Sequence, residues 1–523
     1  MAGPRRPVVT ADSAAQVLHA GQCISEVLED WQGVCRASIP AIAKHLPLFY
    51  RRRESTLPEC MGHYIARVVD LLDPALNRIS NMTVDQARQR LLSGGPDAVR
   101  DIEGSFALLA HEGKTVRLAR SLDRPMRYFL AKRNEGPALV VADRIDAIHN
   151  QLKTDGLDRQ FHPSYTRMVP AHYVVEIQLV GCPDPDPTYT RFFTPQRNAF
   201  STDLDEIGRR YIGVLAEEIA NWLKSIDRGA AGVSLADSDS SSPDLPAGGR
   251  RPAPPIGVCF SGGIDSGSVF LVTYHAMCRL GMNPSRLKAF TLHFAGGPDF
   301  EQAREFVGRL GLGLFLEPIE AKLEELDIAE TIRVLEDYKP LDVECASMGL
   351  TLCRGIRQRY PDWKHLIDGD GGDENLKDYP IEENPELTIR SVVNNLMLYQ
   401  EGWGVGRIKH SLTYSGGLSR SYARTYAPAR HYGFEGFSPY TRRKVIEVAE
   451  GVPFALLSDM SVEKLYALKG EIVSRGVKAV TGFEMPVFAK RRFQHGALSK
   501  ERLRQRWPEE EAVYRRQFLA LYR

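Results

Sequence analysis

The chain has 523 residues, 43% of them apolar and 25% charged, which is typical of a soluble globular protein but too long for one compact core. We therefore expect two domains. The 67 lysines and arginines balance 66 acidic residues, so composition favours neither a nucleic acid nor a membrane as a partner. Eight scattered cysteines without a CxxC pair, and no apolar leader or long apolar run, predict a reduced, cytoplasmic protein.

Residues 1–200 are expected to form a first, β-rich domain. Short apolar runs in 105–120, 138–144 and 172–180 are typical of strands. The first 60 residues look helical, and their pattern indicates no function.

Residues 201–523 are expected to form a second domain that begins with a helix at 203–226, where apolar residues recur at helical spacing. Ser, Asp, Pro and Gly dominate 230–255. Such a segment buries too little apolar surface to order itself, so we expect a mobile loop there.

The pattern then alternates between strands and helices. We expect strands at 256–260, 287–294 and 313–319, and helices at 266–280 and from Asp299. This alternation predicts an α/β fold with a doubly wound parallel sheet. In such sheets ligands bind at the carboxyl ends of the strands, so the loop after Phe260 is the expected site.

That loop contains a string of small and polar residues: Ser261, Gly262, Gly263, Ile264, Asp265 and Ser266. Two glycines let backbone N–H groups approach a ligand, and the following helix points its positive end at the same place. Asp265 fits an anion site if it holds Mg²⁺ beside phosphate. The alternative is a glycine-rich turn in which Asp265 and Ser266 only cap a helix.

The S-G-G-x-D-S string resembles the pyrophosphate loop of the N-type ATP pyrophosphatases, which include the asparagine synthetases. The resemblance implies ATP with Mg²⁺ as cofactors and a reaction that leaves an acyl adenylate and pyrophosphate. Residues 367–374, IDGDGGDE, resemble the S-G-E-G-x-D-E loop of the asparagine synthetases. By that resemblance Gly369 contacts the nucleotide and Asp373 supplies a second Mg²⁺ carboxylate. Asp370 stands where the family has a Glu facing the activated carboxylate.

Further matches extend the resemblance along the chain. PVFAKRRFQHGA at 486–497 is similar to the family's K-x-x-F-x-x-G segment, which implies that Lys490 stabilises the oxyanion and departing AMP. Lys464 corresponds more weakly to another lysine near the phosphates. Leu292 lies at a strand end whose backbone holds adenine in the family. Residues 103–131 resemble the synthetases' N-terminal glutaminase sandwich.

The glutaminase nucleophile of the family is missing. Position 2 is alanine rather than cysteine, no thiol precedes Cys23, and no N-G-E-I-Y-N segment occurs. We therefore expect a degenerate glutaminase-like domain at 1–200 that makes no ammonia from glutamine. The same loss occurs in the β-lactam synthetases of antibiotic biosynthesis and in lasso-peptide cyclases, where an amine of the substrate attacks the acyl adenylate. β-Lactam synthetases also carry a Tyr and Glu pair as base, which the sequence does not identify here.

The sequence thus predicts an AMP-forming carboxylate–amine ligase acting on a small-molecule or peptide carboxylate, with an amine that is internal, ammonia or a second molecule. Homodimer formation stays open. The alternatives are an ammonia-dependent asparagine synthetase and a non-catalytic nucleotide-binding protein. A sulfur-inserting tRNA enzyme is disfavoured by the lack of paired cysteines. Loops at 338–347 and 378–385 are expected to shape the acyl pocket.

Overall fold

The computed structural model describes most of the expected β-rich region and of the expected parallel-sheet region. All the described residues belong to one compact unit, His63–Arg523. Apart from Gly296 and Pro298, the described residues are 65–180, 186–230, 253–378, 381–383, 388–394, 422–488, 507–508 and 510–523. The first 60 residues, most of the loop expected at 230–255, and Lys490 with its neighbours lie outside them.

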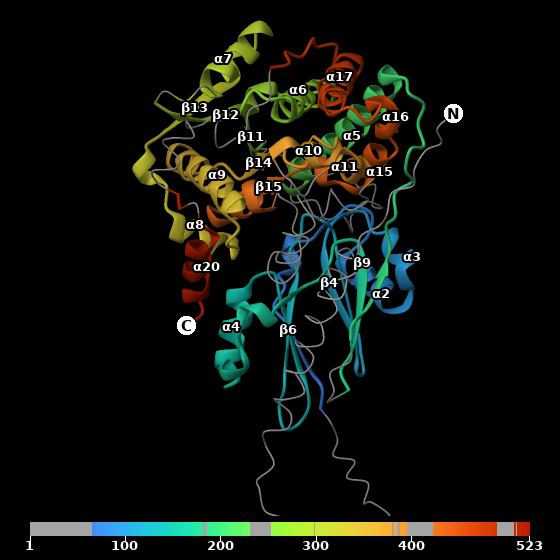
Figure 1. Ribbon diagram of the computed structural model, residues 1–523, viewed down its shortest axis with the longest axis vertical. Helices are drawn as coiled ribbons and strands as arrows, with labels where there is room; N and C mark the ends of the chain where they lie inside the picture. The colour runs from blue at the N-terminus through green and yellow to red at the C-terminus, as the bar shows by residue number, and fades with distance from the viewer. Residues whose placement is uncertain are drawn as a thin grey trace, which may run out of the picture. The chain divides into compact units, whose positions relative to one another are not determined.

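The N-terminal region contains two four-stranded sheets, with the orders β1-β7-β6-β8 and β10-β9-β5-β4 (Figure 1). The strands are Arg67–Asp70 (β1), Ala107–Glu112 (β4), Thr115–Arg120 (β5), Arg127–Ala131 (β6), Ala138–Ala142 (β7), Arg167–Met168 (β8), Tyr173–Gln178 (β9) and Thr188–Arg191 (β10). Leu109 and Leu118 of one sheet share an apolar core with Leu139 of the other, so the sheets face each other. The expected β-rich layers are present, and their relation to a glutaminase stays a prediction.

Smaller elements complete this sandwich. They are the ribbon Arg78–Ile79 (β2) with Gly104–Ser105 (β3), and the helices Val84–Ser93 (α2), Gly95–Arg100 (α3) and Ile145–Thr154 (α4). A capping box begins α2, because Thr83 Oγ1 accepts the Gln86 N–H and Gln86 Oε1 accepts the Thr83 N–H. Arg144, which precedes α4, gives that helix no side-chain cap.

The C-terminal region is built on a five-stranded, all-parallel sheet with the order β13-β12-β11-β14-β15. The strands are Ile256–Cys259 (β11), Leu287–Phe294 (β12), Leu316–Ala321 (β13), His365–Ile367 (β14) and Glu435–Phe437 (β15). The chain moves outward from β11 to β13 and then returns to β14 on the other side of β11. The strand order therefore reverses between β11 and β14, which confirms the doubly wound sheet and locates its switch point.

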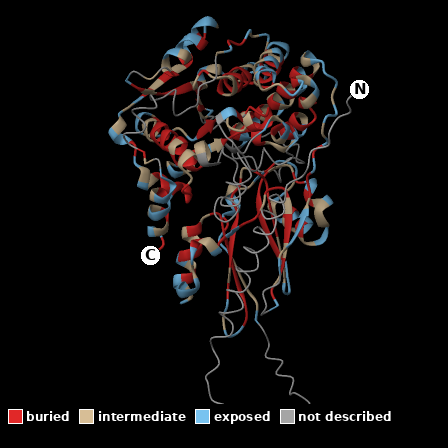
Figure 2. Ribbon diagram, viewed as in Figure 1, coloured by how far each residue is buried: buried red, intermediate tan, exposed pale blue. Residues whose placement is uncertain are grey.

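Helices cover both faces of this sheet. The apolar core on one face contains residues of Leu204–Ala230 (α5), Ile264–Arg279 (α6), Asp299–Arg309 (α7), Ile389–Asn394 (α11), Arg443–Glu450 (α15), Phe454–Ser458 (α16) and Val462–Thr481 (α17). The core on the other face contains residues of Ile328–Leu335 (α8), Pro340–Arg359 (α9), Ala427–His431 (α14) and Glu511–Ala520 (α20). Figure 2 shows the buried residues concentrated along the strands and the inward helix faces. No helix among the described residues is long and apolar enough to cross a membrane.

Two local expectations need correction. Residues 340–347, expected as part of a loop, form the first two turns of α9, because Pro340 at the first helical position fixes φ for a helix and needs no N–H partner. The strand expected at 313–319 begins only at Leu316, after a 3₁₀ turn at Gly313–Phe315. Part of the expected loop at 378–385 lies outside the described residues.

Two glycines set the distance between α5 and α17. A Cβ on Gly208 would lie 2.6 Å from the carbonyl oxygen of Ile472, and one on Gly476 would overlap the carbonyl of Gly208. The two helix backbones therefore touch directly, and no side chain fits between them. This contact fixes the position of α17 above the carboxyl edge of the sheet.

We expect Gly476→Ala to lower the free energy of unfolding by about 1–3 kcal/mol, because its methyl group would force the two backbones apart. Thermal or denaturant unfolding measures this. Gly213→Ala is the matched control on α5, since a Cβ there meets nothing within 4 Å. It should be neutral or stabilising by up to about 1 kcal/mol through helix propensity. Equal destabilisation by both variants would contradict the proposed role of the close contact.

Candidate active site

The glycine loop after β11 folds back on itself at the start of α6. The Ser261 N–H donates to Ser266 Oγ at 3.1 Å, and the two serine hydroxyls are also 3.1 Å apart. Gly262 has a φ of 71°, and a Cβ there would lie 2.8 Å from the Ala303 backbone. Gly263 is the N-cap of α6, so the first N–H groups of this helix, which have no partner within the helix, lie at this loop.

The loop after β14 lies directly against the loop after β11. A Cβ on Gly369 would come within 2.7 Å of the Asp265 carbonyl carbon, and one on Gly372 would overlap Asp265 Oδ1. Gly371 has a φ of 101°, which side chains rarely allow. The structure thus brings the two sequence motifs together, and only glycine permits the contact.

Lys469 of α17 lies among three carboxylates at this junction. Its Nζ is 2.6 Å from Asp265 Oδ2 and 3.3 Å from Asp378 Oδ2, and it also contacts Asp373 Oδ1. Burial would lower the pKa of Lys469, but the three carboxylates outweigh it and raise that pKa well above its usual value. The lysine is therefore charged and neutralises part of the acidic cluster.

Sequence reasoning missed Lys469 and pointed to Lys464 instead. The Lys464 side chain is 58% exposed and pairs with Asp459 at 3.2 Å. Lys469 lies between Leu468 and Ile472 on the buried side of α17. A lysine within the apolar stripe of a helix was the signal that could have identified it, because buried lysines need charged partners.

The donor set at Asp265 and Asp373 fits Mg²⁺ that is shared with phosphate. Both carboxylates reach the same ammonium, so both can reach one cation. In the part of the chain that the structure describes, no group of three or more His, Cys, Asp or Glu side chains could hold a metal by itself. Such a site needs further oxygen ligands, and the phosphates of ATP would supply them.

Asp370 lies on the other side of the second glycine loop, beside the π-helical turn Tyr422–Tyr426 (η10). Its Oδ2 accepts the Thr425 hydroxyl at 2.7 Å. Burial raises the pKa of Asp370 to about 6, although Arg424 and Thr425 act against this. Such a carboxylate is ionised at neutral pH and still basic enough to take a proton from an amine in a reaction.

Three further ionisable groups surround Asp370. Asp368 is 2% exposed, accepts the Asp370 N–H at 3.0 Å and the Ser438 hydroxyl at 2.9 Å, and has a pKa raised well above its usual value by burial and by Asp370. Glu374 is buried, and neither of its carboxylate oxygens has a hydrogen-bond partner among the described residues. Arg424 stays charged, because nearby acidic groups raise its pKa despite burial.

A tyrosine and a glutamate also meet near the lysine cluster. Tyr466, three residues before Lys469, donates to Glu382 at 2.7 Å and accepts the Ile381 N–H at 2.8 Å. Burial, Glu382 and Asp378 raise the pKa of Tyr466. Sequence reasoning identified no such pair, because its two members are more than 80 residues apart and only the fold joins them.

The position of Leu292 suits contact through its backbone. The pairing of β12 with β11 ends where the Phe260 N–H donates to the Phe290 carbonyl at 2.8 Å. Two residues further on, Leu292 directs its N–H and C=O to the same side, where β11 has already ended. Lys490, the remaining expected site residue, lies outside the described residues.

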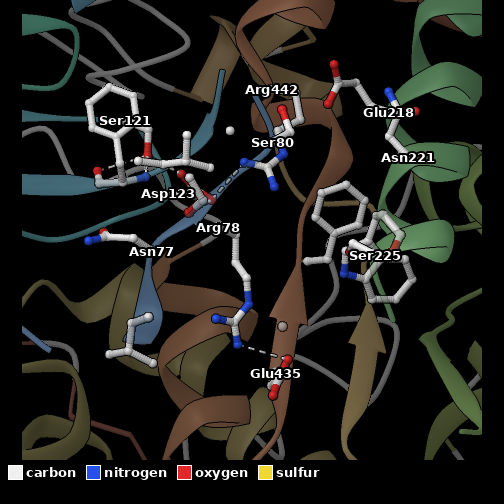
Figure 3. A pocket seen from close by; sticks show the side chains of 18 of the residues that line it. Asn77, Arg78, Ser80, Ser121, Asp123, Glu218, Asn221, Ser225, Glu435 and Arg442 are labelled. Atoms are coloured by element: carbon white, nitrogen blue, oxygen red, sulfur yellow. Dashed lines mark hydrogen bonds and ion pairs between the residues drawn. The ribbon is translucent and has the colours of Figure 1, made fainter. Parts of the chain in front are cut away.

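A large cavity lies elsewhere, at the amino ends of β14 and β15 (Figure 3). It measures about 1210 Å³ and is lined by residues of both the sandwich and the sheet region. The ion pairs Arg442–Asp123 (3.3 Å) and Arg78–Glu435 (3.2 Å) join the two regions there. Neither glycine loop lines this cavity, so it is separate from the candidate active site.

A profile of the asparagine synthase family matches residues 251–426, about a third of the chain. The matched segment contains both glycine loops and Thr425, and it ends before α17. No curated protein matches the chain. The match supports a relation of this segment to the asparagine synthetases and indicates an ATP-dependent ligase or amidotransferase type of activity.

We expect Lys469→Met to destabilise the protein in the absence of Mg²⁺ by about 3–5 kcal/mol, because three carboxylates lose a buried partner. Added Mg²⁺ should recover part of this loss, and thermal unfolding with and without Mg²⁺ measures both effects. Lys464→Met on the same helix should change little, since that pair is exposed. If the two variants behaved alike, the cluster would not be held by Lys469.

Proposed function

We propose that the protein is an ATP-dependent, AMP-forming carboxylate–amine ligase without glutaminase activity. It adenylates a substrate carboxylate and then forms an amide with an amine of the same substrate. The observation that carries this proposal is the meeting of Asp265, Asp373 and Lys469 at the switch point of the sheet. Those residues come from two glycine loops inside the segment that matches the asparagine synthase family, and from the helix above it.

The phosphate half of the site supports adenylation. The hydroxyls and N–H groups of Ser261–Ser266 would bind the β and γ phosphates of ATP at the start of α6. Asp265 and Asp373 would hold Mg²⁺, which would neutralise charge on the phosphates. Lys469 would offset the charge of departing pyrophosphate, since it is already charged and oriented toward this position. The backbone of Leu292 and the Gly369 turn would contact the nucleoside.

The acyl half of the site supports amide formation. Asp370 would accept the proton of the attacking amine, and Arg424 beside it would balance the negative charge of the adenylate. Lys490 remains the proposed cation for the oxyanion. Because an internal amine can act at an effective molarity of about 10⁵ M or more, a reaction of this kind needs no glutamine-derived ammonia.

The sequence has no counterpart of the glutamine-binding N-G-E-I-Y-N segment, which favours a substrate amine over glutamine. This places the proposal near the β-lactam synthetases and peptide cyclases of natural-product biosynthesis. The Tyr466–Glu382 pair is a candidate for the base pair expected in β-lactam synthetases. An ammonia-dependent asparagine synthetase is the alternative, and the same assay separates the two.

We expect pyrophosphate release from ATP·Mg²⁺ with an amino acid alone, tested on aspartate, glutamate and β- and δ-amino acids with and without ammonium. The product should be lighter than the substrate by one water in mass spectrometry. Asp265→Asn should abolish release, whereas Asp459→Asn, an exposed carboxylate, should not. A requirement for aspartate with ammonium would favour the asparagine synthetase. ATP binding without any release would indicate a non-catalytic protein.

We expect amide formation to fall as the pH drops through about 6, because Asp370 must be ionised to accept a proton and its pKa is raised to about 6. Asp370→Asn should slow amide formation by about 10²–10⁴-fold and remove this limb of the pH profile. A first-turnover burst of pyrophosphate should persist. The exposed Asp362→Asn should keep the wild-type profile. An unchanged limb in Asp370→Asn would exclude Asp370 as the base.

A further inference from the structure

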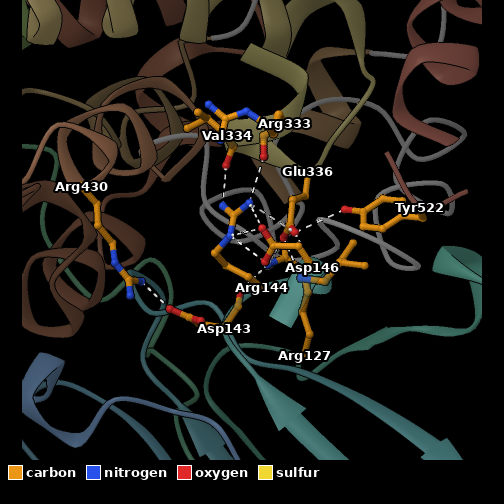
Figure 4. Close-up of polar contacts among 10 residues, drawn as sticks. Arg127, Asp143, Arg144, Asp146, Arg333, Val334, Glu336, Arg430 and Tyr522 are labelled. Carbon is orange, nitrogen blue, oxygen red and sulfur yellow. Dashed lines mark hydrogen bonds and ion pairs between the residues drawn. The ribbon is translucent and has the colours of Figure 1, made fainter. Parts of the chain in front are cut away.

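A buried glutamate joins the N-terminal sandwich to the sheet region (Figure 4). Glu336 ends α8 with a φ of 53° and is 1% exposed. Its Oε2 accepts the Ile145 N–H and its Oε1 accepts the Asp146 N–H, both at 2.7 Å. These are the first amides of α4, so Glu336 provides the cap that Arg144 does not.

The capping is reciprocal. The Arg144 guanidinium donates to the carbonyls of Arg333 and Val334 at 2.9 Å each, so the sandwich in turn caps the C-terminus of α8 (Figure 4). Ile145 is fully buried in the same apolar core as α8 and α9. The ends of α4 and α8 thus satisfy each other's hydrogen-bonding groups across the boundary between the two regions.

Other groups hold the Glu336 carboxylate in place. Arg127 and Arg144 each come within 3.4 Å of it, and Tyr522 donates to it at 3.3 Å. Burial raises the pKa of Glu336, and the two arginines oppose this effect. A buried carboxylate with this many partners is fixed in position, and it fixes the chain that carries it.

The chain runs from Glu336 directly into α9. Asp337 Oδ1 accepts the Tyr338 N–H at 2.7 Å and the Lys339 N–H at 3.2 Å, and Pro340 begins the helix. Tyr338 is buried, and its ring packs 5.2 Å from that of Phe518. The start of α9 is therefore set by the turn at Glu336.

Further along, α9 lies against η10, which carries the Arg424 and Thr425 that act on Asp370. A Cβ on Gly349 would overlap the carbonyl oxygen of Arg424, so α9 and η10 touch backbone to backbone. The next residue, Thr425, hydrogen-bonds Asp370. A continuous chain of contacts thus leads from α4 through Glu336, α9 and η10 to Asp370.

We infer that Glu336 is a positioning residue through which the N-terminal sandwich holds α9, and thereby holds Arg424 and Thr425 against Asp370. In this role the sandwich acts as a structural support, called the brace below, that fixes α9 and η10 and supplies no reacting group from its described residues. This rests on the proposed function, in which Asp370 is the base.

The effect on Asp370 has a definite sign. Burial has the largest effect and raises the pKa of Asp370, Arg424 and Thr425 lower it, and Glu374 and Asp373 raise it further. Asp368 and Cys259 are also close to Asp370, and its charge contributes to raising the pKa of each. Moving Arg424 and Thr425 away removes the lowering contributions, so the acidic limb of the pH profile moves to higher pH.

Glu336→Gln in the full-length chain tests the inference, because it keeps the shape of the side chain and removes its charge. With ATP·Mg²⁺ and the carboxylate that gives fastest pyrophosphate release, kcat should fall by about tenfold to a hundredfold. The acidic limb should move to higher pH. The KM for ATP should stay unchanged, because the phosphate loop packs on the opposite face of the sheet. Gly349→Ala, remote from the sandwich, should shift the limb in the same direction.

Asp123→Asn is the matched control, since it removes another ion pair between the sandwich and the sheet region, to Arg442, that does not lead to α9. It should leave the limb in place. Equal losses of kcat in Glu336→Gln and Asp123→Asn without a limb shift would overturn the inference, as would an unchanged Glu336→Gln.

Hydrogen–deuterium exchange tests the brace without turnover. Residues 327–345 and 422–426 should exchange faster in Glu336→Gln than in the wild type or in Asp123→Asn. Unchanged exchange there would overturn the inference. If no carboxylate supports pyrophosphate release in the wild type, the proposed function fails, and the exchange experiment still decides whether Glu336 holds α9 and η10.

Discussion

Lys469 holds three carboxylates together at the carboxyl edge of the parallel sheet, and the arrangement of the candidate site depends on this cluster. Asp265, Asp373 and Asp378 repel one another, and partial burial strengthens that repulsion. The buried ammonium offsets it. The lysine can reach them only because α17 packs backbone to backbone on α5 at Gly208 and Gly476. Close helix packing therefore decides where the positive charge lies.

The strand order determines which groups can meet. Because it reverses between β11 and β14, the two glycine loops leave adjacent strands and touch at Gly369 and Gly372. The two faces of the sheet contribute different residues to the candidate site. The glycine loop after β11 and Lys469 lie on the face with α5, α6 and α17, whereas Thr425 and Asp370 lie on the face with α9 and η10. A ligand at the edge would contact both.

The N-terminal sandwich and the sheet region stabilise each other where two of their helix ends meet. The helix α4 of the sandwich has no side-chain cap of its own, and the carbonyls of Arg333 and Val334 at the end of α8 accept hydrogen bonds from outside that helix. Glu336 and Arg144 satisfy those ends reciprocally. Without the sandwich, a buried carboxylate and the last carbonyls of α8 would lose their partners, which is costly for buried polar groups.

The sequence by itself determined the elements that have a local signature. These are the alternation of strands and helices that predicts a parallel sheet, and the two glycine strings, in which the glycines themselves indicate tight turns and close backbone contacts. The first two turns of α9, at 340–347, were expected as a loop, and Pro340 starts a helix there whose residues Val343, Cys345 and Ala346 are buried. Only the tertiary structure decided that Lys469 rather than Lys464 meets Asp265 and Asp373, that Thr425 bonds Asp370, and that Glu336 caps α4. Those contacts join residues 55 to 204 positions apart, and which side chains meet at such separations is fixed by packing, not by local pattern.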